Sequence, residues 1–198
     1  MMKEAMLDLP GPLSRLAVDN QDRLPIALVA GDDSAATAAL AQHVTAAGTW
    51  ALPSGRRASA PVYAVPGAAG WPLIEGPLQV AGPHWEFEWG RHWLRALTAA
   101  LGETVPEGSD PYDVLREAGK TRTGVFVACG LEAFIGTASD EAVDTMIRVL
   151  LLDTADHLRA IPDRPFGLLI FIRRDTVRWA VPQNSAQLLN RYCEYALD

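Results

Sequence analysis

Three short apolar runs along the chain predict buried strands. They cover residues 25–30, 124–130 and 166–172, and each is closely followed by charged residues. An uninterrupted apolar run of this length is typical of a strand that is buried on both faces of a sheet. We therefore expect these three segments to form the centre of the fold.

The segments between and after these runs have patterns typical of helices. In residues 85–101, for example, Trp85, Trp89 and Trp93 recur at four-residue intervals and so share one helix face. Strands that alternate with helices predict an α/β fold, with a mainly parallel sheet flanked by helices on both faces. The further helices that we expect cover residues 34–47, 112–118, 139–159 and 182–197.

The length of the chain, 198 residues, is typical of a single domain. We expect residues 25–198 to form this domain and residues 1–24 to form an N-terminal arm. Residues 48–84 contain frequent proline and glycine, which excludes a long helix. We interpret them as an irregular insertion with two short strands, at residues 62–65 and 78–80.

The turn after the first strand lies where a P-loop NTPase would hold its phosphates. The working motif, GxxxxGK[ST], supplies backbone N–H groups, a lysine and a magnesium-binding hydroxyl. Residues 30–37 read AGDDSAAT, so that Thr37 matches the hydroxyl while Ala36 stands in place of the lysine. Alanines also replace both glycines, and only Gly31, Ser34 and Thr37 are left as vestigial nucleotide-binding positions.

Asp32 and Asp33 fall inside the predicted phosphate cradle. A carboxylate there repels phosphate and competes for the same helix N-terminus. At an effective dielectric constant near 20, like charges about 4 Å apart repel by roughly 4 kcal/mol. The loss of the lysine and the gain of two aspartates therefore both act against nucleotide binding.

The segments that follow the other two predicted strands also differ from those of a working P-loop NTPase. Residues 125–132 read VFVACGLE, in which Cys129 replaces the magnesium-binding aspartate and Glu132 remains as a vestige of a water-activating carboxylate. A thiol is a poor magnesium ligand because that cation prefers oxygen. After the third run, Arg173 and Asn184 match positions that sense the terminal phosphate, although a solvated, salt-bridged helix start is the more usual explanation for such residues.

Together, these segments resemble the P-loop domains of bacterial STAND and AAA-like ATPases. The resemblance implies a three-layer sandwich. It also implies a pseudo-ATPase that needs no cofactor and acts through another protein, as a regulatory or scaffold subunit. The partner would be an active NTPase or a second copy of the chain. We consider two uses for Trp85, Trp89 and Trp93: packing in the core, which is the usual fate of an apolar stripe, or forming the interface.

Two alternatives stay open at this point. The first is a weakly active or unconventional NTPase that binds ATP or GTP with magnesium and uses Ser34, Thr37, Glu132 and Arg173. The second is a small-molecule enzyme of Rossmann-like type, which would need a pocket with convergent polar groups at the strand ends.

The composition of the chain bears on its partners, its location and its metal-binding capacity. The net charge of −7 and the pI of about 5.1 argue against a nucleic-acid partner. No apolar stretch is long enough for a membrane span or a signal peptide, so we expect a cytoplasmic location. Cys129 and Cys193 lie far apart and are interpreted as reduced thiols, and the four histidines form no metal-binding pattern.

Overall fold

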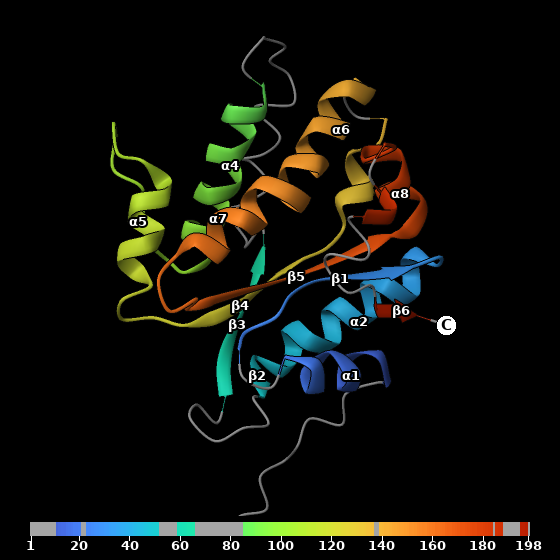
Figure 1. Ribbon diagram of the computed structural model, residues 1–198, viewed down its shortest axis with the longest axis horizontal. Coiled ribbons are helices and arrows are strands. Elements are labelled where there is room, and N and C mark those ends of the chain that lie inside the picture. The colour runs from blue at the N-terminus through green and yellow to red at the C-terminus, as the bar shows by residue number, and fades with distance from the viewer. Residues whose placement is uncertain are drawn as a thin grey trace, which may run out of the picture.

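The computed structural model describes residues 11–20, 23–51, 59–65, 85–136, 139–183, 185–187 and 195–197. Its sheet has the strand order β2-β3-β4-β5-β1-β6 (Figure 1). All neighbouring pairs are parallel except β2 and β3, which are antiparallel at one edge. The expected α/β fold with a mainly parallel sheet is thus confirmed. The strands are β1 (Ile26–Gly31), β2 (Thr49–Ala51), β3 (Ser59–Val65), β4 (Gly124–Ala128), β5 (Phe166–Arg173) and β6 (Tyr195–Leu197).

Helices cover both faces of the sheet. Helices α1 and α2 lie on one side, and the helices from α4 to α8 lie on the other (Figure 1). Side chains alternate along each strand, so Leu28 and Ile170 join the core under α4 and α6, while Val29 and Phe171 join the core under α1 and α2. The helices are α1 (Gly11–Asp19), α2 (Ser34–Ala47), α4 (Trp85–Ala100), α5 (Pro111–Ala118), α6 (Asp140–Val149), α7 (Ala155–Ala160) and α8 (Arg174–Ala180).

The predicted helix over residues 139–159 contains an irregularity that its periodicity does not reveal. A π-helical turn, Leu150–Thr154, separates α6 from α7. The predicted start of this segment is confirmed, because Ser139 caps α6 and its side-chain oxygen accepts from the N–H of Ala142 at 3.3 Å.

Two segments expected to lie outside the core belong to it. Strands β2 and β3 fall within the predicted insertion, yet β3 pairs with β4 in the sheet, with Val62 opposite Val125. The segment expected as an N-terminal arm contains α1, in which Leu13 and Leu16 are fully buried. The strand predicted at residues 78–80 lies outside the described residues.

The helix predicted over residues 182–197 is confirmed only in part: residues 185–187 are helical, but residues 195–197 are not. The helix after β5 begins at Arg174 and ends at Ala180, before Pro182, a residue that disfavours helical geometry at the preceding position. Residues 195–197 form β6 instead, parallel to β1, with Ala30 opposite Ala196. This strand pairs with the free side of β1, whose backbone groups would otherwise lack partners.

Within the part of the chain that the structure describes, no helix combines the length and the apolar character needed to cross a membrane.

Candidate functional site

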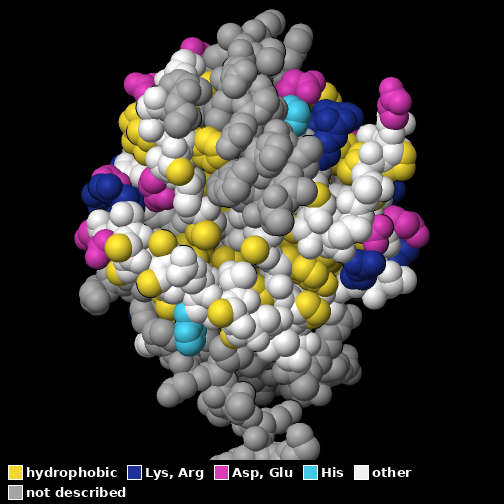
Figure 2. All heavy atoms as spheres, turned by 180° about the vertical axis from the view of Figure 1, so that it is seen from behind, with side chains coloured by type: hydrophobic (Ala, Val, Ile, Leu, Met, Phe, Trp, Pro, Cys, Tyr) yellow, Lys and Arg dark blue, Asp and Glu magenta, His cyan; other side chains and the backbone are white. Residues whose placement is uncertain are grey.

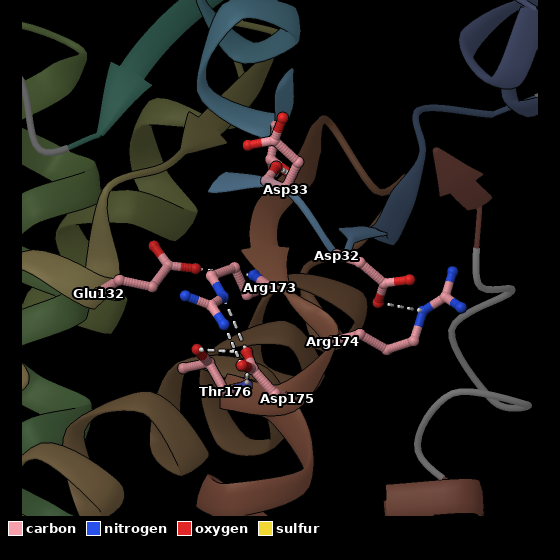
Figure 3. A network of polar contacts seen from close by, with 8 residues as sticks. Asp32, Asp33, Glu132, Arg173, Arg174, Asp175 and Thr176 are labelled. Carbon is pink, nitrogen blue, oxygen red and sulfur yellow. Dashed lines mark hydrogen bonds and ion pairs between the residues drawn. The ribbon is translucent and has the colours of Figure 1, made fainter. Parts of the chain in front are cut away.

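The polar residues that follow β1, β4 and β5 meet at the carboxyl edge of the sheet. Gly31, the last residue of β1, lies opposite Arg173, the last residue of β5. Strand β4 ends beside β5 at Ala128, so Glu132 in the 3-10 turn Leu131–Phe134 reaches the same place (Figure 3). Ligands of parallel α/β sheets bind at this edge, and we therefore take it as the candidate site.

The turn between β1 and α2 is too short to wrap around a phosphate. Only Asp32 and Asp33 separate the end of β1 at Gly31 from the first residue of α2 at Ser34. The positions of the two motif glycines, Ala30 and Ala35, therefore lie inside β1 and inside α2. The rounded loop of inward-pointing N–H groups that anion binding needs is absent from these residues.

The N-terminus of α2 is occupied by a carboxylate of the chain itself. Asp33 is the N-cap, and its Oδ1 accepts from the N–H of Ala35 at 2.8 Å. Thr37, which matches the magnesium-binding hydroxyl, is 3% exposed and donates to the carbonyl of Asp33 at 2.7 Å. The N–H of Ala35 and the hydroxyl of Thr37, which a nucleotide complex would use, are thus both engaged by Asp33.

The cations at this edge already have anionic partners. Arg173 forms a two-contact ion pair with Asp175, one contact being Nε to Oδ1 at 3.0 Å (Figure 3). The Nε atom of Arg174 lies 3.8 Å from Oδ1 of Asp32, and these two residues directly follow the neighbouring strands β5 and β1. A carboxylate beside a guanidinium offsets part of its positive charge, and this weakens its attraction for a phosphate.

Two carboxylates complete the network. Glu132 accepts from the backbone N–H of Arg173 at 2.7 Å, and Asp175 accepts from the N–H of Thr176 at 2.7 Å. Burial acts to raise the pKa of the Asp175 carboxyl, but the hydrogen bonds from Arg173 and Thr176 outweigh it and hold this pKa below its usual value. Asp175 is therefore charged at neutral pH and keeps its ion pair with Arg173.

Cys129 follows β4 at the position that the P-loop resemblance assigns to a magnesium-binding aspartate. Its thiol is free and partly buried. Burial, and then the nearby Glu132 carboxylate, raise the pKa of this thiol. The thiol is consequently protonated at neutral pH, a state that suits neither metal ligation nor nucleophilic attack. Among the described residues, no group of His, Cys, Asp and Glu side chains is arranged to hold a metal ion.

The tryptophan stripe on α4 packs in the core. Trp89 is 3% exposed and Trp93 is fully buried, and the indole N–H of Trp93 donates to the carbonyl of Met146 at 2.9 Å. The packing interpretation is confirmed for these two residues. The interface interpretation is wrong for them, because their stripe faces the sheet and α6 and leaves no ring area for a partner. The side chain of Trp85 lies outside the described part of the chain.

The remaining site predictions have mixed outcomes. Gly31 and Thr37 lie at the edge, Ser34 is exposed at the first position of α2, and Asn184 is outside the described residues. Sequence analysis missed Arg174 and Asp175 as members of the network. The only signal for them was the run Arg-Arg-Asp directly after a buried strand, which placed their charges at the same edge as Asp32.

The capping role of Asp33 leads to a direct prediction. Asp33→Ala removes the acceptor for the N–H of Ala35 and should lower the free energy of unfolding by about 0.5–2 kcal/mol. Asp32→Ala is the matched control. The Asp32 carboxylate is 81% exposed, and its removal breaks only the 3.8 Å ion pair with Arg174. We therefore expect this variant to change the free energy of unfolding by less than about 0.5 kcal/mol. Urea denaturation measures both, and equal effects would contradict the capping assignment.

Comparisons with protein-family models, with curated proteins and with solved structures found no match for this chain.

Proposed function

We propose that this domain is a degenerate P-loop NTPase module, a pseudo-ATPase that acts by binding another protein and not by hydrolysing a nucleotide. The observation that carries the proposal is the N-terminus of α2. The cap carboxylate of Asp33 occupies the position where a phosphate would accept hydrogen bonds. A second carboxylate, Asp32, stands beside it, so an incoming phosphate would meet two like charges and no lysine.

The order of the strands supports a P-loop ancestry. Without β2, and numbered along the chain, the parallel strands have the order 2-3-4-1-5. The first strand thus neighbours the fourth, and the fourth separates it from the strand that leads to Glu132. In the Rossmann and flavodoxin-like orders, by contrast, the first strand neighbours the second. This difference counts against the Rossmann-like enzyme. An inserted fourth strand agrees with the resemblance to STAND and AAA-like ATPases, in which that strand carries the phosphate sensor.

Surface features support a role in protein contact. Helix α2 contains no Asp, Glu, Lys or Arg, and it exposes Ala35, Ala36, Ala39 and Ala46. On the face opposite the view of Figure 1, hydrophobic side chains spread across the middle, while charged side chains gather nearer the margins (Figure 2). A surface with few charges at its centre is easier to desolvate when a partner binds.

The experiment that tests the loss of nucleotide binding is a thermal-shift titration of the full chain with ATP and GTP in the presence of magnesium. A ligand at 100 times its dissociation constant adds about 2.7 kcal/mol of stability. We expect no saturable shift at millimolar nucleotide. An active P-loop ATPase in the same buffer serves as the positive control.

A weakly active NTPase is the second candidate, because Glu132 and Arg173 still lie together at the carboxyl edge. It predicts a saturable shift that requires magnesium and disappears in Arg173→Ala. Such a result would overturn the pseudo-ATPase proposal. The same variant also tests the site, since a shift that survives Arg173→Ala would place the nucleotide elsewhere.

A further inference from the structure

A groove separate from the carboxyl edge lies between α4, the start of α5, and the π-helical turn that leads into α7. It has a volume of about 430 Å³. Helix α4 forms one wall with Phe87 and Arg91, and Tyr112 of α5 and His157 of α7 lie across from it. We infer that this groove binds an arginine-bearing segment of a partner protein, with the guanidinium group among the groove's carboxylates and the apolar stem against its aromatic rings.

The apolar part of the groove is accessible. Phe87 is 66% exposed, which is high for a residue of its size, and Leu94 and Gly90 lie behind it. Across the groove, Tyr112 packs edge-on against the ring of His157 at a centroid distance of 5.3 Å. Arginine buries a long apolar stem while its charged end stays near polar groups, and such a surface accommodates that stem.

Both rings already attract guanidinium groups of this chain. The Arg91 guanidinium lies 5.7 Å from the centre of the Phe87 ring, and that of Arg116 lies 6.0 Å from the centre of the Tyr112 ring. These are cation–π distances. The groove therefore presents rings whose chemistry suits a planar cation, at positions where much of Phe87 stays open to solvent.

The charges in the groove select a cation as the ligand. Three carboxylates line it, those of Glu86, Asp110 and Asp153, against a single arginine, Arg91. Glu86 is paired with Arg148 at 2.7 Å, and Asp110 accepts from the N–H of Tyr112 at 3.0 Å as the cap of α5. The Asp153 carboxylate makes no hydrogen bond or ion pair with the described residues, and so it is the acceptor available to a partner.

The surroundings of Asp153 disfavour its charge in the free protein. Burial, and then the neighbouring Glu86 carboxylate, raise the pKa of Asp153. A guanidinium seated beside both carboxylates would relieve this repulsion, and that gain appears only in the complex. The π-helical turn, Leu150–Thr154, carries Asp153 into the groove, and such turns recur at functional sites.

This inference goes beyond the proposed function, because the groove shares no residue with the network at the carboxyl edge of the sheet. The test uses the full-length chain labelled with ¹⁵N and two short amphipathic peptides. The first peptide has two arginines among leucines and alanines, and the second has citrulline in their place. Citrulline keeps the shape of arginine but removes its charge. We expect the arginine peptide to shift the amide signals of Phe87, Tyr112 and Asp153, and to bind at least about tenfold more tightly than the citrulline peptide.

Two single substitutions test whether the Asp153 carboxylate is the group that binds the arginine peptide. Asp153→Asn should weaken binding of the arginine peptide and leave that of the citrulline peptide unchanged. Asp113→Asn is the matched control, since Asp113 is an exposed carboxylate on α5 that pairs with Arg116 outside the groove lining. Equal affinities for the two peptides, signal changes elsewhere, or no effect of Asp153→Asn would each overturn the inference. Self-association of the free chain through Phe87, detected by sedimentation, would assign the groove to a second copy instead.

The nucleotide titration and the peptide titration test the two proposals independently, so either proposal can be overturned while the other stands. A nucleotide shift would remove the pseudo-ATPase proposal and leave the groove untouched. Conversely, an absence of peptide binding would leave the assignment of the α2 N-terminus as it stands.

Discussion

Trp93→Ala should lower the free energy of unfolding by about 3–5 kcal/mol, the usual cost of truncating a buried aromatic residue. Trp93 is fully buried between the sheet and α6, and its indole N–H donates to the carbonyl of Met146 at 2.9 Å. The substitution removes the packing of a large ring and this hydrogen bond together. Because domains of this size have only about 5–15 kcal/mol of stability in total, urea denaturation should show a large shift of the midpoint.

Two further variants on α4 test how ring packing, the hydrogen bond and burial each contribute to the free energy of unfolding. Trp93→Phe keeps most of the ring but loses the donor, and should cost about 1 kcal/mol for the hydrogen bond together with a smaller packing loss. Phe87→Ala, at a position that is 66% exposed, should change stability by less than about 0.5 kcal/mol. If Trp93→Ala and Phe87→Ala had equal effects, the burial of the tryptophan stripe would be wrong.

The central strands and their helices could be predicted because their signals are local. The apolar runs that became β1, β4 and β5 are uninterrupted, and Asp33 and Ser139 cap the helices at the expected places. Local patterns of this kind depend only on backbone geometry and on burial. They can therefore be recognised in a sequence that contains no intact functional motif.

The places of the edge strands in the sheet could not be predicted, because pairing between segments remote in sequence decides them. Strand β6 has only the residues Tyr195–Leu197, and its role depends on pairing with β1, which is remote in sequence. The short strand expected at residues 62–65 is confirmed within β3, but its pairing with β4, which makes it part of the sheet, was not foreseen. Short strands carry weak propensity, and tertiary pairing decides their state.

The site was predictable in its location but not in its contacts. Asp32 and Glu132 follow β1 and β4, and Arg173 is the last residue of β5, so parallel pairing brings them to one edge. The partners of these residues could not be derived, since Glu132 accepts from a backbone N–H and Arg173 pairs with Asp175 two residues away. Such choices depend on side-chain rotamers at a few positions, and sequence spacing does not encode them.

Gly167→Ala is expected to be strongly destabilising, although alanine favours ordered structure more than glycine does. A Cβ atom at this position in β5 would lie 2.6 Å from the carbonyl oxygen of Pro25. That carbonyl cannot move away easily, because it accepts from the N–H of Leu168 at 2.7 Å. The clash is with backbone, at the point where the chain enters β1. We expect a loss of about 1–3 kcal/mol or more, measured by urea denaturation.

Gly90→Ala is the matched control, with the same chemical change and the opposite expected sign. Gly90 is buried in α4, and a Cβ there would meet only Cγ1 of Val149 at 4.0 Å, which is ordinary contact. Since alanine is favoured over glycine inside a helix by about 1 kcal/mol, this variant should be as stable as the parent or more so. A destabilised Gly90→Ala together with a neutral Gly167→Ala would show that the close approach of β5 to Pro25 is not what selects glycine at position 167.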